Sequence, residues 1–400
     1  MKQLSLILLV MILMISGCSE KNDDPEIHQP SHIEPTSDLY SQNFPTIYDV
    51  EDNYIPPLNT MVNFKTDYPE IDEIMIELEP VMSVIHKSYD AHHYYKDDQD
   101  DLIANVALIN DYYNSKESIE VSDELIGFIT KSLELSTLTE GYFNPFLGIV
   151  SELYDGRFSP FPVTNTDPDE EALEQALGCV VRPDEFRDVL EINGNSLTFH
   201  QYKDCEKVMM DFGASAKGSA TDILADQLEN LEYDYVLDAG TSSIVTNSEE
   251  GISVGIRSPY NKVSSIYSLN LTEGWRLSTS GDDSSYYLLE EDPTVIRCHI
   301  LDPETGISNT TYRSVTVLSP DNMISDALST ALFNMDDVDM ILQTVNRVKD
   351  YYDIEIEFAL LKETDSEKQL CDLLVSSGFR DFIKEDYVSS NIDQIIVLGE

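Results

Sequence analysis

The second half of the sequence is a succession of short runs rich in β-branched and aromatic residues, and this feature most constrains the fold. Such runs, separated by Gly, Asn, Asp and Ser, are typical of strands. Only two segments among them, residues 219–231 and about 321–335, have helical spacing. Strands that follow one another so closely predict an α+β fold with a substantial, largely antiparallel sheet flanked by helices. The runs are KVMMDF (207–212), YDYVLDA (233–239), SIVTN (243–247), GISVGI (251–256), IYSLNL (266–271), WRLSTS (275–280), IRCHIL (296–301) and RSVTVL (313–318).

The first half of the chain has helical rather than strand periodicity. Apolar residues recur at three- and four-residue intervals from about 68 to 88, which predicts a helix. Residues 121–138 predict a second helix with Ser122 as its N-cap. Toward the C-terminus, residues 338–361 predict a further helix and a further strand, which an acidic segment follows. The apolar positions of the first helix are Ile71, Ile74, Leu78 and Met82.

The charge of the chain excludes one class of function and constrains another. The sequence has 24 Lys and Arg residues against 75 Asp and Glu, a formal net charge of −51. A chain this acidic repels a phosphate backbone, so we expect no nucleic-acid partner. It also repels small anions, so a phosphate ligand needs a local lysine, a helix N-terminus or a metal cation.

The N-terminus resembles a bacterial lipoprotein signal. Lys2 precedes the apolar run LSLILLVMILMI, which is too short for a comfortable membrane span and fits a signal-peptide core. Small residues then precede Cys18 in ISGC, as in the bacterial lipobox. We therefore predict a signal peptide over residues 1–17, lipidation of Cys18, and an acidic flexible tether over 18–44. This would hold the protein on the extracytoplasmic face of a bacterial cell membrane; a plain secretory signal is the alternative.

The remaining cysteines do not indicate a zinc site. They are far apart and form no CxxC pair, although two of them could form a disulfide in an exported protein. The spacing leaves that pairing open, and reduced buried cysteines fit equally well. His92 and His93 lie in an acidic, tyrosine-rich stretch, which favours an exposed loop over a metal site. The four cysteines are Cys179, Cys205, Cys298 and Cys371.

Residues 209–222, MMDFGASAKGSATD, combine an apolar strand, a small-residue loop with one lysine, and a helix start. The stretch is neither a Walker A loop, since Lys217 precedes a glycine, nor a G-x-G-x-x-G loop. Ser219 and Asp222 have capping-box spacing, which predicts a helix start at about Ser219. The free N–H groups of that helix, together with Lys217, favour an anion. An ordinary strand-to-helix turn with a surface lysine would also fit.

Asp326 and Thr330 lie four residues apart in the helix expected over 321–335, and so share one face. A carboxylate and a hydroxyl beside an apolar stripe could supply two hard oxygen ligands for Mg²⁺. The polar edge of an amphipathic helix is the alternative interpretation.

Five motifs in a fixed order resemble the ApbE family of FAD:protein FMN transferases. They are D-x-G-x-x-x-KG-x-x-x-D (211–222), TSG-D (279–282), H-I-x-DP-x-TG (299–306), SVTV (314–317) and DALST-A (326–331). The resemblance covers roughly residues 45–385 and leaves 386–400 as a C-terminal tail. It implies a T-fold-like α+β fold of the family's own type.

The resemblance also implies an activity and a set of site residues. Family members use Mg²⁺ to cleave FAD, transfer the FMN part to a threonine of a target flavoprotein, and release AMP. The resemblance places His299 near the scissile phosphate as a catalytic residue beside Asp326. The implied FAD-binding residues are Asp211, Lys217, Tyr142, Phe143, Asn144, Ile300 and, as a weaker match, Tyr89. The implied Mg²⁺ ligands are Asp326, Thr330 and the backbone carbonyl of Ala214.

The sequence departs from the family pattern at three places. The strand-end turn reads DAGTSS where the family usually has two glycines, and the usual SGDY is SGDDSSYY here. The loop at about 92–101 is expanded and acidic. These departures bear on acceptor choice and flavin affinity more than on the reaction.

The chemistry of the reaction agrees with these residue types. Breaking a phosphoanhydride requires neutralised phosphate oxygens and an activated hydroxyl, and a histidine such as His299 can act as the base. A structural histidine is the alternative there. Two other functions stay open: a Mg²⁺-dependent FAD pyrophosphatase, in which water replaces the threonine, and a non-catalytic flavin-binding lipoprotein.

Overall fold

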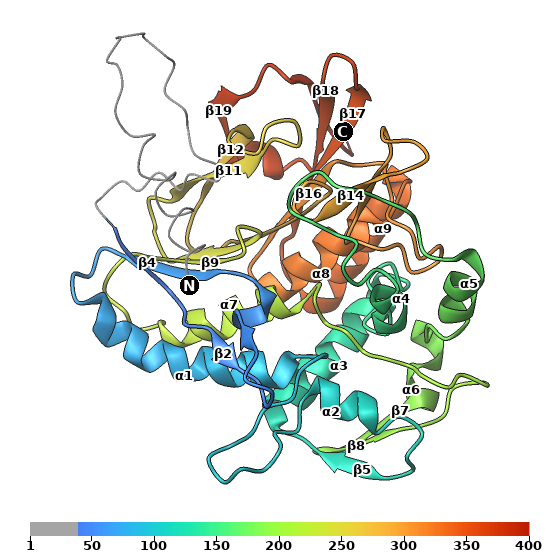
Figure 1. The fold of residues 1–400 in the computed structure, drawn as a ribbon. Helices are drawn as coiled ribbons and strands as arrows, with labels where there is room; N and C mark the ends of the chain where they lie inside the picture. The colour runs from blue at the N-terminus through green and yellow to red at the C-terminus, as the bar shows by residue number, and fades with distance from the viewer. Residues whose placement is uncertain (1–38, 400) are drawn as a thin grey trace, which may run out of the picture.

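A nine-stranded sheet forms the centre of the molecule in the computed structural model, which describes residues 39–399 (Figure 1). All neighbouring strands of this sheet are antiparallel except β18 and β20, which confirms the α+β fold with a largely antiparallel sheet. In spatial order the strands are β1 (Tyr40–Asn43), β4 (Val62–Thr66), β9 (Tyr235–Ala239), β10 (Ser243–Thr246), β13 (Arg276–Gly281), β16 (Ser314–Ser319), β17 (Glu357–Asp365), β18 (Leu370–Val375) and β20 (Ile392–Val397).

Helices cover one face of this sheet, and a smaller sheet covers the other (Figure 1). Side chains alternate between the two layers: Leu237 of β9 packs in the core on the helix side, and its neighbour Val236 packs toward β11 and β12. The helices are α1 (Ile71–Tyr89), α2 (Val106–Asp111), α3 (Asp123–Leu138), α4 (Gly148–Glu152), α5 (Glu170–Gly178), α6 (Phe186–Val189), α7 (Ala216–Gln227), α8 (Asn322–Phe333) and α9 (Val338–Tyr352). The smaller sheet consists of β11 (Ile252–Arg257), β12 (Ser265–Leu271) and β19 (Ile383–Val388).

Three further groups of strands lie outside these layers. They are β14 (Tyr286–Leu289) between β15 (Ile296–Cys298) and β6 (Thr164–Asn165), then β8 (Ser196–Phe199) between β5 (Ser118–Glu120) and β7 (Leu190–Asn193), and the pair β2 (Ile47–Tyr48) and β3 (Tyr54–Ile55).

The helices expected in the first half of the chain are confirmed as α1 and α3. The side chain of Ser122 accepts a hydrogen bond of 3.1 Å from the backbone N–H of Leu125, so it caps α3 as its position predicts. In α1, three of the four apolar positions of the stripe are buried, and Ile71 at the first turn is partly exposed. The spacing of apolar residues therefore predicted the buried face of α1 correctly.

The strand expected over residues 207–212 is wrong. This segment belongs to no sheet, and side chains and loop carbonyls replace the missing ladder. The amide of Asn110 bonds both the N–H and the carbonyl of Met210, at 2.8 and 2.9 Å, and Asp211 N–H donates to Pro145 O at 2.8 Å. An apolar run can be buried without a strand partner when its backbone groups are satisfied in this way.

The expected start of α7 at Ser219 is also wrong, since the helix begins at Ala216 and Ser215 is its N-cap residue. Asp222 does not cap its own helix. Its carboxylate instead accepts the N–H groups of Asn322 and Met323, at 3.0 and 2.9 Å, and so caps α8 across the core. Gly218 allows the two helices to meet, because a Cβ there would lie 2.2 Å from the carbonyl oxygen of Asn322.

A disulfide joins Cys179 and Cys205, a pairing that the sequence left open. It links the end of α5 to the segment that leads into residues 207–212. Cys298 and Cys371 are free and buried.

The expected boundaries of the tether and of the domain can be compared with the structure only within residues 39–399. Residues 1–38, with the signal peptide, Cys18 and most of the tether, lie outside the described residues. β1 lies within the segment expected to be tether, and the expected boundary at residue 385 falls inside β19. From residue 39 to 399, no helix is both long and apolar enough to span a membrane.

Candidate active site

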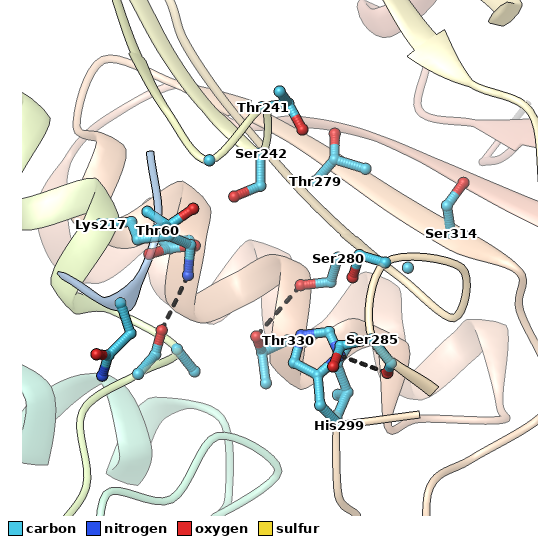
Figure 2. A pocket seen from close by; sticks show the side chains of 18 of the residues that line it. Thr60, Lys217, Thr241, Ser242, Thr279, Ser280, Ser285, His299, Ser314 and Thr330 are labelled. Atoms are coloured by element: carbon cyan, nitrogen blue, oxygen red, sulfur yellow. Dashed lines mark hydrogen bonds and ion pairs between the residues drawn. The ribbon is translucent and has the colours of Figure 1, made fainter. Parts of the chain in front are cut away.

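A cavity of about 810 Å³ opens at the ends of the central strands β9, β10, β13 and β16 of the main sheet, bounded by α7, α8, the β9–β10 turn and β11. Figure 2 shows Lys217, Thr330 and His299 around this cavity, although they come from three different segments of the chain. Ten of the eleven site residues that the resemblance implies line it: Tyr142, Phe143, Asn144, Asp211, Ala214, Lys217, His299, Ile300, Asp326 and Thr330.

Tyr89 is the residue that the structure does not bring to the cavity. Its ring stacks on Phe128 with ring centroids 3.7 Å apart, and its hydroxyl lies 3.2 Å from Ser219 Oγ. Burial raises the pKa of the Tyr89 phenol to about 12. The side chain is therefore part of the core between α1, α3 and α7.

Asp326 lies on the buried side of α8 with a side chain that is 6% exposed. Its Oδ2 accepts a hydrogen bond of 2.9 Å from the backbone N–H of Gly218, at the start of α7. Burial raises the pKa of the carboxyl group, whereas the nearby ammonium of Lys217 and the Gly218 N–H act to lower it. One helical turn later, the Thr330 hydroxyl lies 3.2 Å from Ser280 Oγ (Figure 2).

The second oxygen of Asp326, Oδ1, has no short hydrogen bond. Ser278 Oγ donates to Asn322 Oδ1 at 3.0 Å, so the single hydroxyl proton of Ser243 is directed to Ser278 Oγ, also at 3.0 Å. Ser243 Oγ stays 3.5 Å from Asp326 Oδ1, and Lys217 Nζ is 3.9 Å from it. A buried carboxylate oxygen is thus left with weak partners beside the cavity, as expected of a cation ligand.

The donors at this point fit Mg²⁺. Asp326 Oδ1, the Thr330 hydroxyl and the Ala214 carbonyl are hard oxygen atoms of the kind that Mg²⁺ prefers. The part of the chain that the structure describes contains no group of three or more His, Cys, Asp or Glu side chains arranged to hold a metal. An ion at Asp326 would therefore take its remaining ligands from water and substrate phosphate.

Lys217 lies in the first turn of α7 and reaches along the cavity wall. Its Nζ donates to the carbonyl of Gly213 at 2.9 Å, which holds the ammonium next to Asp326. The free N–H groups expected at this helix start are already used, since Ala216 N–H donates to Phe212 O at 2.9 Å and Gly218 N–H donates to Asp326 Oδ2. The ammonium of Lys217 is therefore the group at this point that favours a phosphate.

Asp211 is paired with a histidine that the sequence indicated only as part of an exposed loop. His92 Nε2 lies 3.4 Å from Asp211 Oδ2, and the Gly213 N–H donates to Asp211 Oδ1 at 2.8 Å. Although burial acts to raise the pKa of Asp211, the hydrogen bond and charge of His92 lower it overall. The partner carboxylate in turn raises the pKa of His92.

His299 presents one ring nitrogen to the cavity (Figure 2). Its Nδ1 lies 3.2 Å from the carbonyl oxygen of Ser285, and since a carbonyl only accepts, Nδ1 carries the proton and Nε2 is free. The side chain is exposed to the cavity. Desolvation by the surrounding protein and the charge of Lys217 lower the pKa of His299 from 6.5 to about 4. At neutral pH the ring is therefore an uncharged base.

Tyr142, Phe143, Asn144 and Ile300 form a largely apolar part of the cavity wall. Asn144 is already occupied, since its Nδ2 donates to Val181 O at 3.0 Å and its Oδ1 accepts the Phe146 N–H at 2.9 Å. Its amide therefore shapes the wall, and the aromatic residues provide the apolar surface.

The cavity also contains residues to which sequence reasoning assigned no role. Ser280 and Thr241 occur in stretches noted as departing from the family pattern, so those departures were the available signal. No feature of the sequence indicated a role for Thr60 or Arg257. Gly240 and Thr241, at the turn between β9 and β10, have φ values of +67° and +61°. A β-branched residue rarely adopts this conformation, which explains why two glycines suit the turn.

Comparisons with known proteins agree with this geometry. A sequence model of the ApbE family matches residues 61–352. The chain is 24% identical over 337 residues to the FAD:protein FMN transferase of Vibrio cholerae serotype O1, which covers 82% of this chain and 87% of that protein. The crystal structure of the ApbE protein from Thermotoga maritima has a TM-score of 0.65 at 22% identity and covers 87% of this chain and 100% of that one. The flavin transferase ApbE from Vibrio cholerae has a TM-score of 0.62 at 21% identity, covering 86% and 99%. These two structures share the fold of the present chain.

Proposed function

The chain belongs to the ApbE family, and we propose that it transfers the FMN part of FAD to a threonine hydroxyl of a target flavoprotein, with release of AMP. The observation that carries this proposal is the convergence of Asp326, Thr330, Lys217 and His299 on one cavity. Each supplies a group that cleavage of a phosphoanhydride requires. Asp326 and Thr330 lie together on α8, whereas Lys217 and His299 come from two other segments.

The pyrophosphate would bind at the part of the cavity that Lys217 and the proposed metal ligands line. Lys217 Nζ would bind phosphate oxygens, which the net charge of −51 would otherwise repel. Asp326, Thr330 and the Ala214 carbonyl would hold Mg²⁺, which supplies charge neutralisation on the phosphate oxygens when bound. The aromatic wall at Tyr142 would accept an apolar ring system.

His299 would act on the acceptor. Its free Nε2 takes the proton of the threonine hydroxyl while the hydroxyl oxygen forms a bond to the phosphorus of the FMN part. The bond between that phosphorus and the bridging oxygen breaks, and AMP leaves with the bridging oxygen and, finally, the proton. Water in place of the threonine would give FMN and AMP, which is the pyrophosphatase alternative.

We further propose that the chain is held at the extracytoplasmic face of a bacterial membrane through lipidated Cys18. The short apolar run and ISGC support this placement. Its acceptor would then be an exported or membrane-bound flavoprotein.

The test combines the purified protein with FAD, Mg²⁺ and a candidate flavoprotein that carries an exposed threonine. We expect the acceptor mass to rise by one FMN, with one AMP released per acceptor modified. Mass spectrometry of the acceptor after digestion identifies the modified residue. AMP release without acceptor modification would support the pyrophosphatase alternative, and the absence of both products would contradict either enzyme.

A further inference from the structure

An exposed phenylalanine lies beside the mouth of the cavity. Phe161 is 73% exposed, the highest value among the large apolar side chains of residues 39–399. It belongs to the loop 157–163 between α4 and β6, which runs beside β14 and pairs with it at Ser159 (Figure 1). Two neighbours in the same loop, Phe158 and Pro160, line the cavity. The exposed ring therefore continues the apolar wall of the cavity onto the outer surface.

The loop is held firmly on both sides of this ring. Ser159 and Tyr286 exchange two backbone hydrogen bonds of 3.1 and 3.0 Å, and Leu288 N–H donates to Val163 O at 2.8 Å. Phe158 stacks on Tyr154 with ring centroids 5.2 Å apart.

The exposed residue itself lies between two prolines. Pro160 and Pro162 fix the backbone on each side of it, and Lys262 donates to the carbonyl of Pro160. A ring presented on a rigid support loses little conformational entropy when a partner covers it.

Two cations lie near this ring in an otherwise acidic chain. Lys262 Nζ lies 4.8 Å above the Tyr286 ring, and Arg257 at the end of β11 lines the cavity. Arg257 uses only its Nε in an ion pair, 2.6 Å from Asp283 Oδ2. Asp283 pairs with Arg257 and also lines the cavity, as does Asp155, so the two cations do not make the mouth positive. The exposed ring is the feature that a partner would contact there.

The proposed reaction requires a protein to contact this area. A cavity of about 810 Å³ admits a ligand and a single side chain but not a folded domain, so the parts of an acceptor next to its threonine must lie over the mouth. We propose that Phe161 is the docking contact for the acceptor flavoprotein, and that it inserts into an apolar depression beside the acceptor threonine. This inference rests on the proposed function.

The experiment compares Phe161→Ser with Ile76→Ser in the full chain. Ile76 is a matched control because it is 72% exposed on α1 and does not line the cavity. The probe is the flavoprotein that the wild-type chain modifies in the preceding test. We expect Phe161→Ser to raise KM for this acceptor about tenfold or more with little change in kcat. Ile76→Ser should leave both unchanged. AMP release from FAD without acceptor should be the same in all three proteins, which shows that the site is intact.

Three outcomes would overturn the proposal. An unchanged acceptor KM in Phe161→Ser, with wild-type transfer intact, would show that Phe161 does not dock the acceptor. If the wild-type chain modifies no acceptor at all, the proposed function fails and this inference fails with it. Sedimentation with phosphatidylglycerol vesicles tests a membrane role, using a chain that starts after Cys18. Loss of vesicle binding in Phe161→Ser, with acceptor KM unchanged, would make the ring a membrane contact instead.

Discussion

At the scale of single residues, the carboxylate of Asp326 and the ammonium of Lys217 lie next to each other in the lining of the cavity. Asp326 Oδ1 is buried with only weak partners, and Lys217 Nζ lies 3.9 Å from it. A cation between Asp326 and a phosphate would satisfy the oxygen that the protein leaves short of donors. Replacing Asp326 should therefore reduce the Mg²⁺-dependent reaction, whereas replacing Lys217 should weaken FAD binding.

Asp326→Ala should lower Mg²⁺-stimulated AMP release from FAD by about 10²–10³-fold, because charge stabilisation of the phosphate is lost. Asp326→Asn should be nearly as damaging, since an amide keeps the hydrogen bond from Gly218 N–H but not the charge. His299→Ala should slow the reaction with little change in the Mg²⁺ concentration that gives half the maximal rate. The measurement is AMP release across a Mg²⁺ titration. Wild-type release by Asp326→Ala at every concentration would remove Asp326 from the metal site.

Lys217→Ala should weaken FAD binding by roughly 10–100-fold, because a charge-assisted contact to a phosphate contributes about 1.5–3 kcal/mol. Lys368→Ala removes the same charge from an exposed position outside the cavity and is the control for the overall charge of −51. Equilibrium binding by flavin fluorescence gives both affinities. Equal affinities in the two variants would make Lys217 a surface residue without a role in binding.

At the scale of elements, two turns beside the cavity have left-handed backbone conformations, and a buried neutral histidine holds one of them. The β9–β10 turn places Thr241 at φ +61°, and Leu58 and Asn59 on the facing wall have φ values of +51° and +55°. Such conformations persist where the surrounding structure determines them, and they are common at functional sites. Contacts with neighbouring segments hold both turns in these backbone conformations.

Thr241→Gly should raise the free energy of unfolding by about 0.5–1 kcal/mol, because relief of the left-handed strain exceeds the entropy that glycine adds to the unfolded chain. Gly240→Ala is the contrasting change at the adjacent position. It should destabilise the protein, since its φ is +67° and its Cβ would lie 2.5 Å from Thr60 Oγ1. Urea unfolding monitored by circular dichroism measures both. A Thr241→Gly protein less stable than wild type would show that the side chain outweighs the strain.

His86 on α1 holds the Leu58 turn and makes stability depend on pH. The Leu58 N–H donates to His86 Nδ1 at 3.0 Å, and Tyr95 Oη lies 2.9 Å from Nε2, so the ring is neutral when folded. Burial lowers its pKa from 6.5 to about 4. Above pH 6.5 the ring is neutral in both states, but between pH 6.5 and 4 only the unfolded chain binds the proton. The free energy of unfolding should therefore fall by about 1–3 kcal/mol across that window.

The matched variant is His86→Asn, whose amide oxygen can still accept the Leu58 N–H but does not titrate. The difference in unfolding free energy between wild type and variant should change between pH 6.5 and 4 and stay constant above pH 7. Parallel curves for the two proteins over the whole range would contradict a buried, neutral His86.

At the scale of the whole molecule, the chain has a net charge of −51, and the lining of the cavity includes two cations, Lys217 and Arg257. The disulfide between Cys179 and Cys205 closes a loop with a sequence separation of 26 residues, next to the segment that carries Asp211. Such a bond is typical of exported proteins, which agrees with the proposed placement outside the cytoplasm.

Cys18→Ala should release the protein from the membrane fraction into the soluble fraction. Acyl chains on this residue are the only attachment that the sequence suggests, and a tether of polar residues follows it. The measurement is the distribution of the protein between the two fractions after high-salt washing, with Ser19→Ala as the control that keeps the cysteine. Full membrane retention of Cys18→Ala would contradict lipidation.

Local pattern alone determined much of the fold. The apolar spacing of α1, the Ser122 cap of α3, and the strands β9 to β13, β15 and β16 follow from interactions within a few residues, which the sequence displays directly. The same holds for the pairing of Asp326 and Thr330 on one face of α8. Together with the family motifs, this local information was enough to name ten residues that now line one cavity.

Tertiary structure decided where the remaining polar groups find partners. Asp222 caps a helix 100 residues away, Asn110 completes the backbone of Met210 at the same separation, and His92 meets Asp211. A capping-box spacing or an apolar run cannot reveal these contacts, because the distant group competes with the local one only after the chain has folded. Tyr89 entered the core for the same reason: the stacking surface of Phe128 became available only when α1 and α3 packed together.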